Sequence, residues 1–306
     1  MPVCPGEDLT GSGERGILGA QGGGKMNGWL LGCAAAVAVW GWLLRPARRT
    51  PPESAAFSGC LLAHRGLHDA AAGVPENSLA AYAAAVRHGV GIEADVRLTA
   101  DGEVICFHDG ELSRLCGCSG RPEEYTLSEL SKLRLMKTEE KIPTLSALLQ
   151  TVNGRVPLLI EYKANARNAA ALCRAADRVL AEYAGAYRVE SFYPGVLRWY
   201  RRHRPETARG QLVGSVCRGD KPVLPLLLLG TLLGNVLTRP DFLAVDFRRP
   251  PTPAVALCCR LGAERIVWTV TDPPSLRRAA EKADGVIFEG FLPPDSEKTE
   301  KSRPAP

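Results

Sequence analysis

Short apolar runs alternate with segments of helical periodicity between residues 60 and 289 of this chain. The runs are four to six residues long and rich in Val, Ile and Leu, which is typical of strands buried on both faces. Repeated strand–helix units of this kind form a parallel sheet covered by helices. The pattern predicts nine strands, at 60–63, 91–96, 103–107, 157–161, 187–191, 208–213, 242–246, 265–270 and 285–288.

The connection between the second and third predicted strands is only four residues long, at 99–102. A crossover between parallel strands needs a dozen or more residues, so we expect 103–107 to fold back as an antiparallel arm. Eight parallel strands then remain, which is the number that closes a (β/α)8 barrel of the usual size, about 230 residues. The predicted fold is therefore α/β, a (β/α)8 TIM barrel with a β-hairpin arm after its second strand.

An uncharged apolar stretch, "MNGWLLGCAAAVAVWGWLL" at 26–44, precedes the barrel. Its 19 residues are long enough to cross a bilayer as a helix, which predicts one N-terminal transmembrane anchor. No signal-peptide cleavage site follows it, and Cys33 lies too far inside the run to be the lipidated residue of a lipoprotein. Three arginines follow the stretch, so we expect a single-pass protein of the cell membrane with its catalytic domain in the cytoplasm.

The remaining segments divide the chain further. Residues 1–25 lack periodicity and are predicted to be disordered or a mis-assigned start, because "QGGGKM" resembles a translated ribosome-binding stretch before Met26. A linker is expected at 45–58, the barrel at 59–294 and a disordered tail at 295–306. The apolar segment 222–237 is too short to span a bilayer and is either a buried barrel helix or a membrane-surface segment.

Composition changes this picture little. The 306 residues carry a net charge of +5, without a dense basic block or basic residues interleaved with aromatics, so no nucleic-acid partner is expected. The ten cysteines include no C-x-x-C pair, which favours free thiols in a reducing compartment.

Polar residues gather at the predicted carboxyl ends of the strands, where such barrels carry their active sites. They are His64, Arg65, Glu93, Asp95, His108, Glu161 and Lys163. Three carboxylates with only oxygen ligands suit a hard divalent ion such as Mg²⁺ or Ca²⁺. The two histidines would then act as general acid and general base, and the two cations would clamp a phosphate. A further histidine, His68, lacks a partner and is predicted to lie on a surface loop.

The motifs "AHRG", "PENS", "IEADV", "FHD", "LLIEYK", "ESFYPGVL" and "VWTV", in this order, resemble the glycerophosphodiester phosphodiesterase family over residues 60–288. The resemblance is to a bacterial-type member, here with a membrane anchor. It implies a TIM barrel that uses one divalent cation, Mg²⁺ or Ca²⁺. The implied activity is hydrolysis of glycerophosphodiesters to sn-glycerol 3-phosphate and an alcohol, in glycerophospholipid metabolism.

The resemblance also implies roles for single residues. His64 and His108 form the acid–base pair, Glu93, Asp95 and Glu161 bind the metal, and Arg65 and Lys163 contact the phosphate. Glu76 and Asn77 of the "PEN" motif line the site, and Trp268 forms a wall for the substrate. Two positions depart from the family pattern: Thr271 replaces the usual Asn, and Glu289 stands where an Asp is usual.

Two alternatives remain open. The predicted anchor and the apolar segment 222–237 would also suit a lysophospholipase D that acts on membrane lysophospholipids. The second alternative is a barrel that binds phosphate without catalysis.

Overall fold

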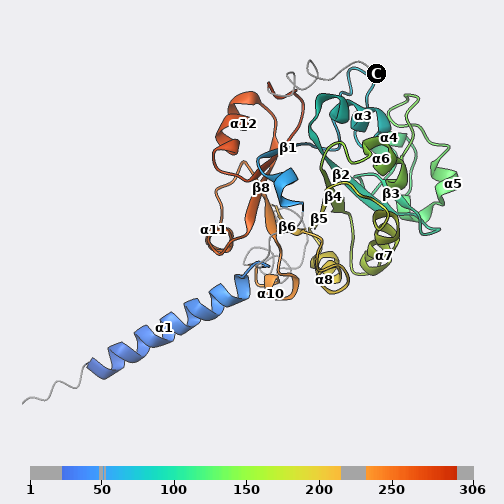
Figure 1. Cartoon of the computed structure of the whole chain (residues 1–306). Coiled ribbons are helices and arrows are strands. Elements are labelled where there is room, and N and C mark those ends of the chain that lie inside the picture. Colours follow the sequence, from blue (N-terminus) through green and yellow to red (C-terminus); the bar gives the residue numbers. More distant parts are fainter. Residues whose placement is uncertain (1–22, 48–50, 52, 215–231, 295–306) are drawn as a thin grey trace, which may run out of the picture. The chain divides into compact units, whose positions relative to one another are not determined.

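A computed structural model describes residues 23–47, 51, 53–214 and 232–294 of the chain (Figure 1). The predicted disordered tail, most of the predicted N-terminal segment 1–25 and most of the apolar segment 222–237 lie outside these residues. Within the described ranges nine strands form one sheet. Their bounds are β1 Cys60–Ala63, β2 Gly91–Leu98, β3 Val104–Cys106, β4 Leu158–Tyr162, β5 Tyr187–Ser191, β6 Arg209–Val213, β7 Phe242–Asp246, β8 Glu264–Val270 and β9 Gly285–Phe288.

The sheet closes on itself through β1. This strand pairs in parallel with β9, with Ala63 opposite Phe288, and in parallel with β2, with Leu62 opposite Gly91. The strand order around the barrel is β1-β9-β8-β7-β6-β5-β4-β2, and β3 lies antiparallel beside β2. The predicted eight-stranded parallel barrel and its antiparallel arm are therefore both confirmed.

Helices follow most of the strands and lie around the barrel in Figure 1. Five of the described helices begin after a Ser, Thr or Asp whose side chain accepts a hydrogen bond from a backbone N–H of the first turn, which stabilises the helix start. The described helices are α1 Gly23–Leu44, α2 Ser54–Phe57, α3 Leu79–His88, α4 Ser113–Cys116, α5 Leu127–Leu130, α6 Leu145–Val152, α7 Ala169–Leu180, α8 Pro194–His203, α10 Asn235–Thr238, α11 Pro253–Arg260 and α12 Pro273–Ala280, together with a 3₁₀ turn at Pro122–Glu124.

The inside of the barrel is closed by an aromatic residue from α2, within the segment predicted to be a linker. Phe57 is buried and packs with Leu62, Leu159 and other apolar residues of the strands. The Arg188 guanidinium lies 4.5 Å from the centre of the Phe57 ring and forms an ion pair with Glu264. Arg188 comes two residues before Glu190 on β5, so the Phe57 plug lies toward the amino ends of the strands. The carboxyl ends of the strands are not closed by Phe57 and are therefore available for a functional site.

The predicted transmembrane anchor falls on α1, which begins three residues earlier than expected. Among the residues that the structure describes, no helix combines the length and the hydropathy needed to cross a bilayer. The prediction of an anchor is therefore not supported.

The described cysteines bear out the prediction of free thiols. All eight of them are unpaired, and Cys106, Cys173 and Cys258 are buried. These three buried cysteines behave as small apolar side chains of the core.

Candidate active site

The turn after β1 begins the loop that leads to α3 and lies at the carboxyl end of the strand. Arg65 and Gly66 both have left-handed backbone conformations, with φ of 56° and 80°. A Cβ atom at Gly66 would lie 2.9 Å from the Cβ atom of Ala81 in α3, so glycine is needed for this close approach. The same turn directs the Arg65 backbone N–H toward β2, where it donates to Glu93 Oε2 at 2.9 Å.

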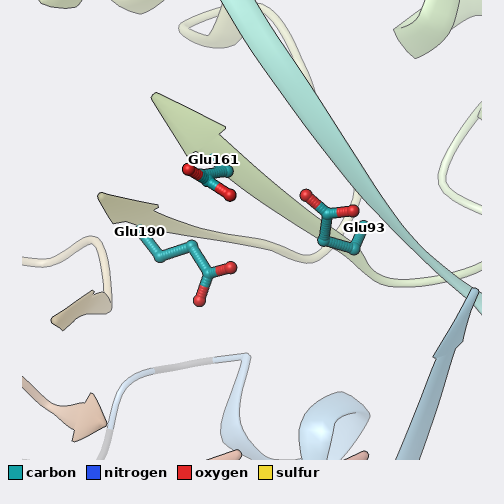
Figure 2. Close-up of side chains that lie close together, drawn as sticks. All are labelled: Glu93, Glu161 and Glu190. Carbon is teal, nitrogen blue, oxygen red and sulfur yellow. The ribbon is translucent and has the colours of Figure 1, made fainter. Parts of the chain in front are cut away.

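Four buried carboxylates lie on three neighbouring strands. Asp95 on β2, Glu161 on β4 and Glu190 on β5 stand opposite one another in the register, so they belong to the same face of the sheet. Glu93 precedes Asp95 by two residues and shares that face. Figure 2 shows the side chains of Glu93, Glu161 and Glu190 turned toward a common space. One carboxylate oxygen from each lies within 4.8 Å of the others.

Asp95 is held differently from the other three. Its Oδ2 atom accepts a hydrogen bond from Asn77 Nδ2 at 2.9 Å, and its Oδ1 atom lies 2.9 Å from Lys163 Nζ. The Arg65 Nε atom is 3.4 Å from Oδ2. Asn77 is itself buried and accepts from the Tyr82 hydroxyl at 2.8 Å. Asn77 thus positions Asp95 instead of lining the cavity.

The charges of this cluster are unevenly balanced. Burial, and then the negative charges of Asp95 and Glu161, raise the pKa of the Glu93 carboxyl well above its usual range. The pKa of Glu190 is raised in the same way, first by burial and then by Glu161 and Glu93. Burial also acts to raise the pKa of Asp95, but the Lys163 ammonium and other nearby cations outweigh it and bring that pKa below its usual range. The electrostatics therefore favour a cation beside Glu93 and Glu190.

Each of the two predicted catalytic histidines has a carboxylate at its Nδ1 atom. His64 Nδ1 lies 2.9 Å from Glu289 Oε2, and His108 Nδ1 lies 2.8 Å from Asp109 Oδ1. A carboxylate at Nδ1 fixes the ring and leaves Nε2 free to exchange a proton. Burial lowers the pKa of His108, which keeps its imidazole neutral at neutral pH.

His68 lies in a loop, as predicted, but the expectation that it lacks a partner is wrong. Its Nε2 atom lies 3.3 Å from Glu289 Oε1, and only 16% of its side chain is exposed. Glu289 therefore joins His64 to His68. The pairing of β1 with β9 brings Glu289 to this place from 225 residues along the chain, which the local sequence pattern does not reveal.

A series of ion pairs connects Arg65 to His108. Arg65 Nη1 donates to Glu76 Oε1 at 2.6 Å, and Arg114 Nη1 donates to Glu76 Oε2 at 2.8 Å. Arg114 Nε also donates to Asp109 Oδ2 at 2.6 Å, and Asp109 holds His108. Glu76, which was predicted to line the site, thus connects Arg65 to Arg114.

A profile of the glycerophosphoryl diester phosphodiesterase family matches residues 64–289, from the first histidine to its carboxylate partner. The chain belongs to this family. The match covers β2 to β9 of the barrel and each side chain of the site described above.

Individual members of the family are similar over shorter stretches. A Bacillus subtilis (strain 168) protein, whose name gives it this activity provisionally, is 38% identical over 110 residues, 34% of this chain and 44% of the relative. Glycerophosphodiester phosphodiesterase 1 of Bos taurus is 35% identical over 150 residues, 44% of this chain and 43% of the relative. The matched stretches thus span less than half the length of these relatives.

A solved structure shares the fold over most of the chain. It is a phosphodiesterase from Oleispira antarctica in complex with the product sn-glycerol-3-phosphate. Its TM-score is 0.64 at 23% identity, and the superposition covers 81% of this chain and 98% of that one.

In the present chain, the side chains of the site line a cavity of about 180 Å³. Its polar lining consists of His64, Arg65, Glu93, His108, Glu161, Lys163 and Glu190. Its apolar wall consists of Phe192, Leu212, Trp268 and Ile287. Most of the predicted site residues thus meet at one cavity, whereas Glu76, Asn77 and Asp95 are not among the residues that line it.

Four residues of the cavity lining were not predicted from the sequence: Glu190, Phe192, Leu212 and Ile287. Glu190 lies near the end of a correctly predicted strand, so an acidic residue at a strand end was an available signal. Phe192 follows it and packs edge-to-face on Trp268, with the ring centres 6.0 Å apart. Nothing in the alternation of apolar and polar residues distinguishes such a wall residue from a core aromatic.

Proposed function

We propose that this chain is a metal-dependent phosphodiesterase that hydrolyses glycerophosphodiesters to sn-glycerol 3-phosphate and an alcohol. One observation carries the proposal. Two histidines, each held at Nδ1 by a carboxylate, face one cavity with an acidic cluster and two cations. Family membership and the activity named for its relatives support the same function.

The buried carboxylates suit a divalent cation. Glu93 Oε1 and Glu190 Oε2 are buried without a hydrogen-bond partner among the described residues, and an all-oxygen donor set is what Mg²⁺ and Ca²⁺ prefer. Glu93 and Glu161 would hold the ion, with Asp95 as the third predicted ligand. Such an ion, when bound, supplies positive charge that neutralises the phosphodiester oxygens.

The cations would orient the phosphate. Lys163 lies 2.6 Å from Glu161 and Arg65 lies 2.6 Å from Glu76, so both are fixed by carboxylates while they line the cavity. Side chains fixed before the substrate arrives lose little freedom on binding and stabilise the charge that develops on the phosphorus oxygens.

The histidines would move the protons. One deprotonates the nucleophile, which is either the glycerol 2-hydroxyl or water, and the other protonates the alkoxide that leaves. The Nε2 atom of His64 points toward the acidic cluster and lies 4.0 Å from Glu93 Oε2. The attacking oxygen would form its bond to phosphorus as the bond to the alcohol oxygen breaks, so one proton is taken up and one is given back. If the 2-hydroxyl attacks, a cyclic phosphate forms, and water would then open it and restore the 2-hydroxyl, so that both routes give glycerol 3-phosphate.

The substrate would be a small glycerophosphodiester. The Oleispira antarctica relative holds sn-glycerol-3-phosphate, which is the product expected here. The Phe192 and Trp268 rings would pack against the apolar part of the substrate. The lysophospholipase D alternative is not favoured, because the relatives are named for glycerophosphodiester phosphodiesterase activity.

The experiment measures release of glycerol 3-phosphate from glycerophosphocholine by the full-length chain. His64→Ala and His108→Ala should each reduce turnover by about 10³-fold or more, because both steps of proton transfer are needed. His203→Ala, an exposed histidine on α8, is the control and should leave turnover unchanged. Near-normal turnover of either active-site variant would refute the assignment.

A further inference from the structure

Glu190 is the one member of the acidic cluster that neither the strand-end pattern nor the family resemblance brought into the metal site. Its side chain is 1% exposed and lines the cavity between β4 and β6. One of its carboxylate oxygens lies within 4.8 Å of oxygens of Glu93 and Glu161. Opposite oxygen ligands of Ca²⁺ are about 4.6–5.2 Å apart, so three oxygens with this spacing can share one ion.

The charges around Glu190 are not balanced by protein cations. Lys163 Nζ lies 2.9 Å from Asp95 and 2.6 Å from Glu161, so its single charge is shared between these two carboxylates. The Arg65 guanidinium lies beside Asp95 and Glu76. In the described part of the chain, no Lys or Arg forms an ion pair with Glu93 or Glu190.

The hydrogen bonds are also incomplete. Glu190 Oε2 is buried and has no hydrogen-bond partner among the described residues, and the same holds for Glu93 Oε1. A buried carboxylate oxygen without a partner is costly, and protein structures almost always provide one. Both unpartnered oxygens belong to side chains that line the same cavity. A divalent cation between them would compensate two negative charges and both oxygens at once.

We propose that Glu190 is a ligand of the divalent cation in this chain, together with Glu93 and Glu161. Added to the trio of Glu93, Asp95 and Glu161 predicted from the sequence, Glu190 gives the site four carboxylates. This inference rests on the proposed metal-dependent function, since it concerns the same ion.

The test is metal binding by isothermal titration calorimetry. The full-length protein, freed of metal with EDTA, is titrated with CaCl₂ and with MgCl₂. Glu190→Gln should raise the Kd of the ion that the wild type binds by at least about 10-fold, because ligand or near-ligand changes typically cost 10- to 100-fold. Glu103→Gln changes an exposed glutamate of the hairpin arm in the same way and should leave the Kd unchanged.

Thermal unfolding separates a ligand from a structural residue. Without metal, the Glu190→Gln protein should be at least as stable as the wild type, because the change removes repulsion among buried carboxylates. With metal, the increase in Tm should be smaller in Glu190→Gln than in the wild type. A variant that is less stable without metal, yet gains as much from it as the wild type, would overturn the proposal in favour of a structural role.

The titrations distinguish failure of the metal-dependent function from failure of the role of Glu190. If the wild type binds neither ion, both the metal-dependent function and the role of Glu190 are refuted. If the wild type binds an ion and Glu190→Gln binds it with the same Kd, only the role of Glu190 is refuted.

Discussion

Replacing Glu289 by glutamine tests whether the carboxylate positions His64 for catalysis. The Glu289 side chain joins His64 Nδ1 at 2.9 Å and His68 Nε2 at 3.3 Å. These two hydrogen bonds lower the pKa of Glu289, so the side chain is a carboxylate at neutral pH. Glutamine keeps the size and one acceptor oxygen but removes the charge. His64 would then lose both a fixed tautomer and the stabilisation of its protonated form.

The magnitude follows from the kind of hydrogen bond that is lost. A hydrogen bond to a charged group contributes about 1.5–3 kcal/mol. Because the Glu289 side chain is 33% exposed, water weakens the interaction and the lower part of that range, about 1.5–2 kcal/mol, is expected. If this stabilisation is needed in the transition state, Glu289→Gln should lower kcat/KM by about 10- to 30-fold. The loss should appear in kcat with little change in KM.

The assay is steady-state release of glycerol 3-phosphate from glycerophosphocholine, accompanied by calorimetric titration of the divalent ion. Metal affinity should be unchanged in Glu289→Gln, which separates positioning of His64 from damage to the ion site. His68→Ala should cost less than Glu289→Gln, since His68 contacts only the other oxygen of the carboxylate. Glu281→Gln at the exposed end of α12 is the matched control. A kcat/KM within twofold of the wild type for Glu289→Gln would refute the reasoning.

Two further predictions concern the residues behind the cavity. Asn77→Gly removes the amide that forms hydrogen bonds with Asp95 and the Tyr82 hydroxyl, and glycine tolerates the backbone φ of 52° at this position. The variant should lower the free energy of unfolding, measured by urea titration, by about 2–4 kcal/mol. Asn77→Ala should cost about 1 kcal/mol more, because alanine is strained at that φ; equal stability of Asn77→Gly and wild type would contradict this role. Arg114→Gln should cost about 1 kcal/mol or less at pH 7, since the Arg114 side chain is 48% exposed. Hydrogen bonds from Arg114 and His108 outweigh burial and lower the pKa of Asp109 from 3.8 to about 2. The stability that Arg114 contributes is therefore present above pH 3.8 and is lost as the pH falls toward 2. A difference in unfolding free energy between Arg114→Gln and wild type that persists at pH 2 would contradict this account.

The strands could be predicted because each is an apolar run bounded by turn residues or helical periodicity. The predicted bounds of β5 at 187–191 and of β7 at 242–246 agree with the structure. The strand β2 extends two residues farther than predicted, to Leu98, because the arm pairs with it there. Pairing with a neighbour extends a strand beyond its apolar run, and a local pattern does not contain that information.

The polar residues at strand ends could be predicted for a similar reason. His64, Glu161 and Lys163 each follow or end an apolar run, and barrel topology brings such ends together. The partner of His64 could not be found in this way. Glu289 reaches it only because β9 closes the barrel against β1, and no periodicity in the sequence records that contact.

Asn77 was predicted to line the site and instead lies behind it. The residue follows Glu76 in a loop, and the sequence alone does not show whether a polar side chain in a loop faces a cavity. The left-handed backbone at Asn77 turns its amide toward Asp95. The distinction between a contact residue and a supporting residue therefore needed the three-dimensional structure.

The central claim is that this barrel hydrolyses a glycerophosphodiester with the help of a divalent cation. The most direct test is ³¹P NMR of glycerophosphocholine incubated with the full-length chain, with Ca²⁺ or Mg²⁺ and, in parallel, with EDTA. The account predicts that the diester resonance is replaced by that of glycerol 3-phosphate when a cation is present and persists in EDTA. A diester resonance that remains unchanged with both cations, or that disappears equally fast in EDTA, would contradict the account.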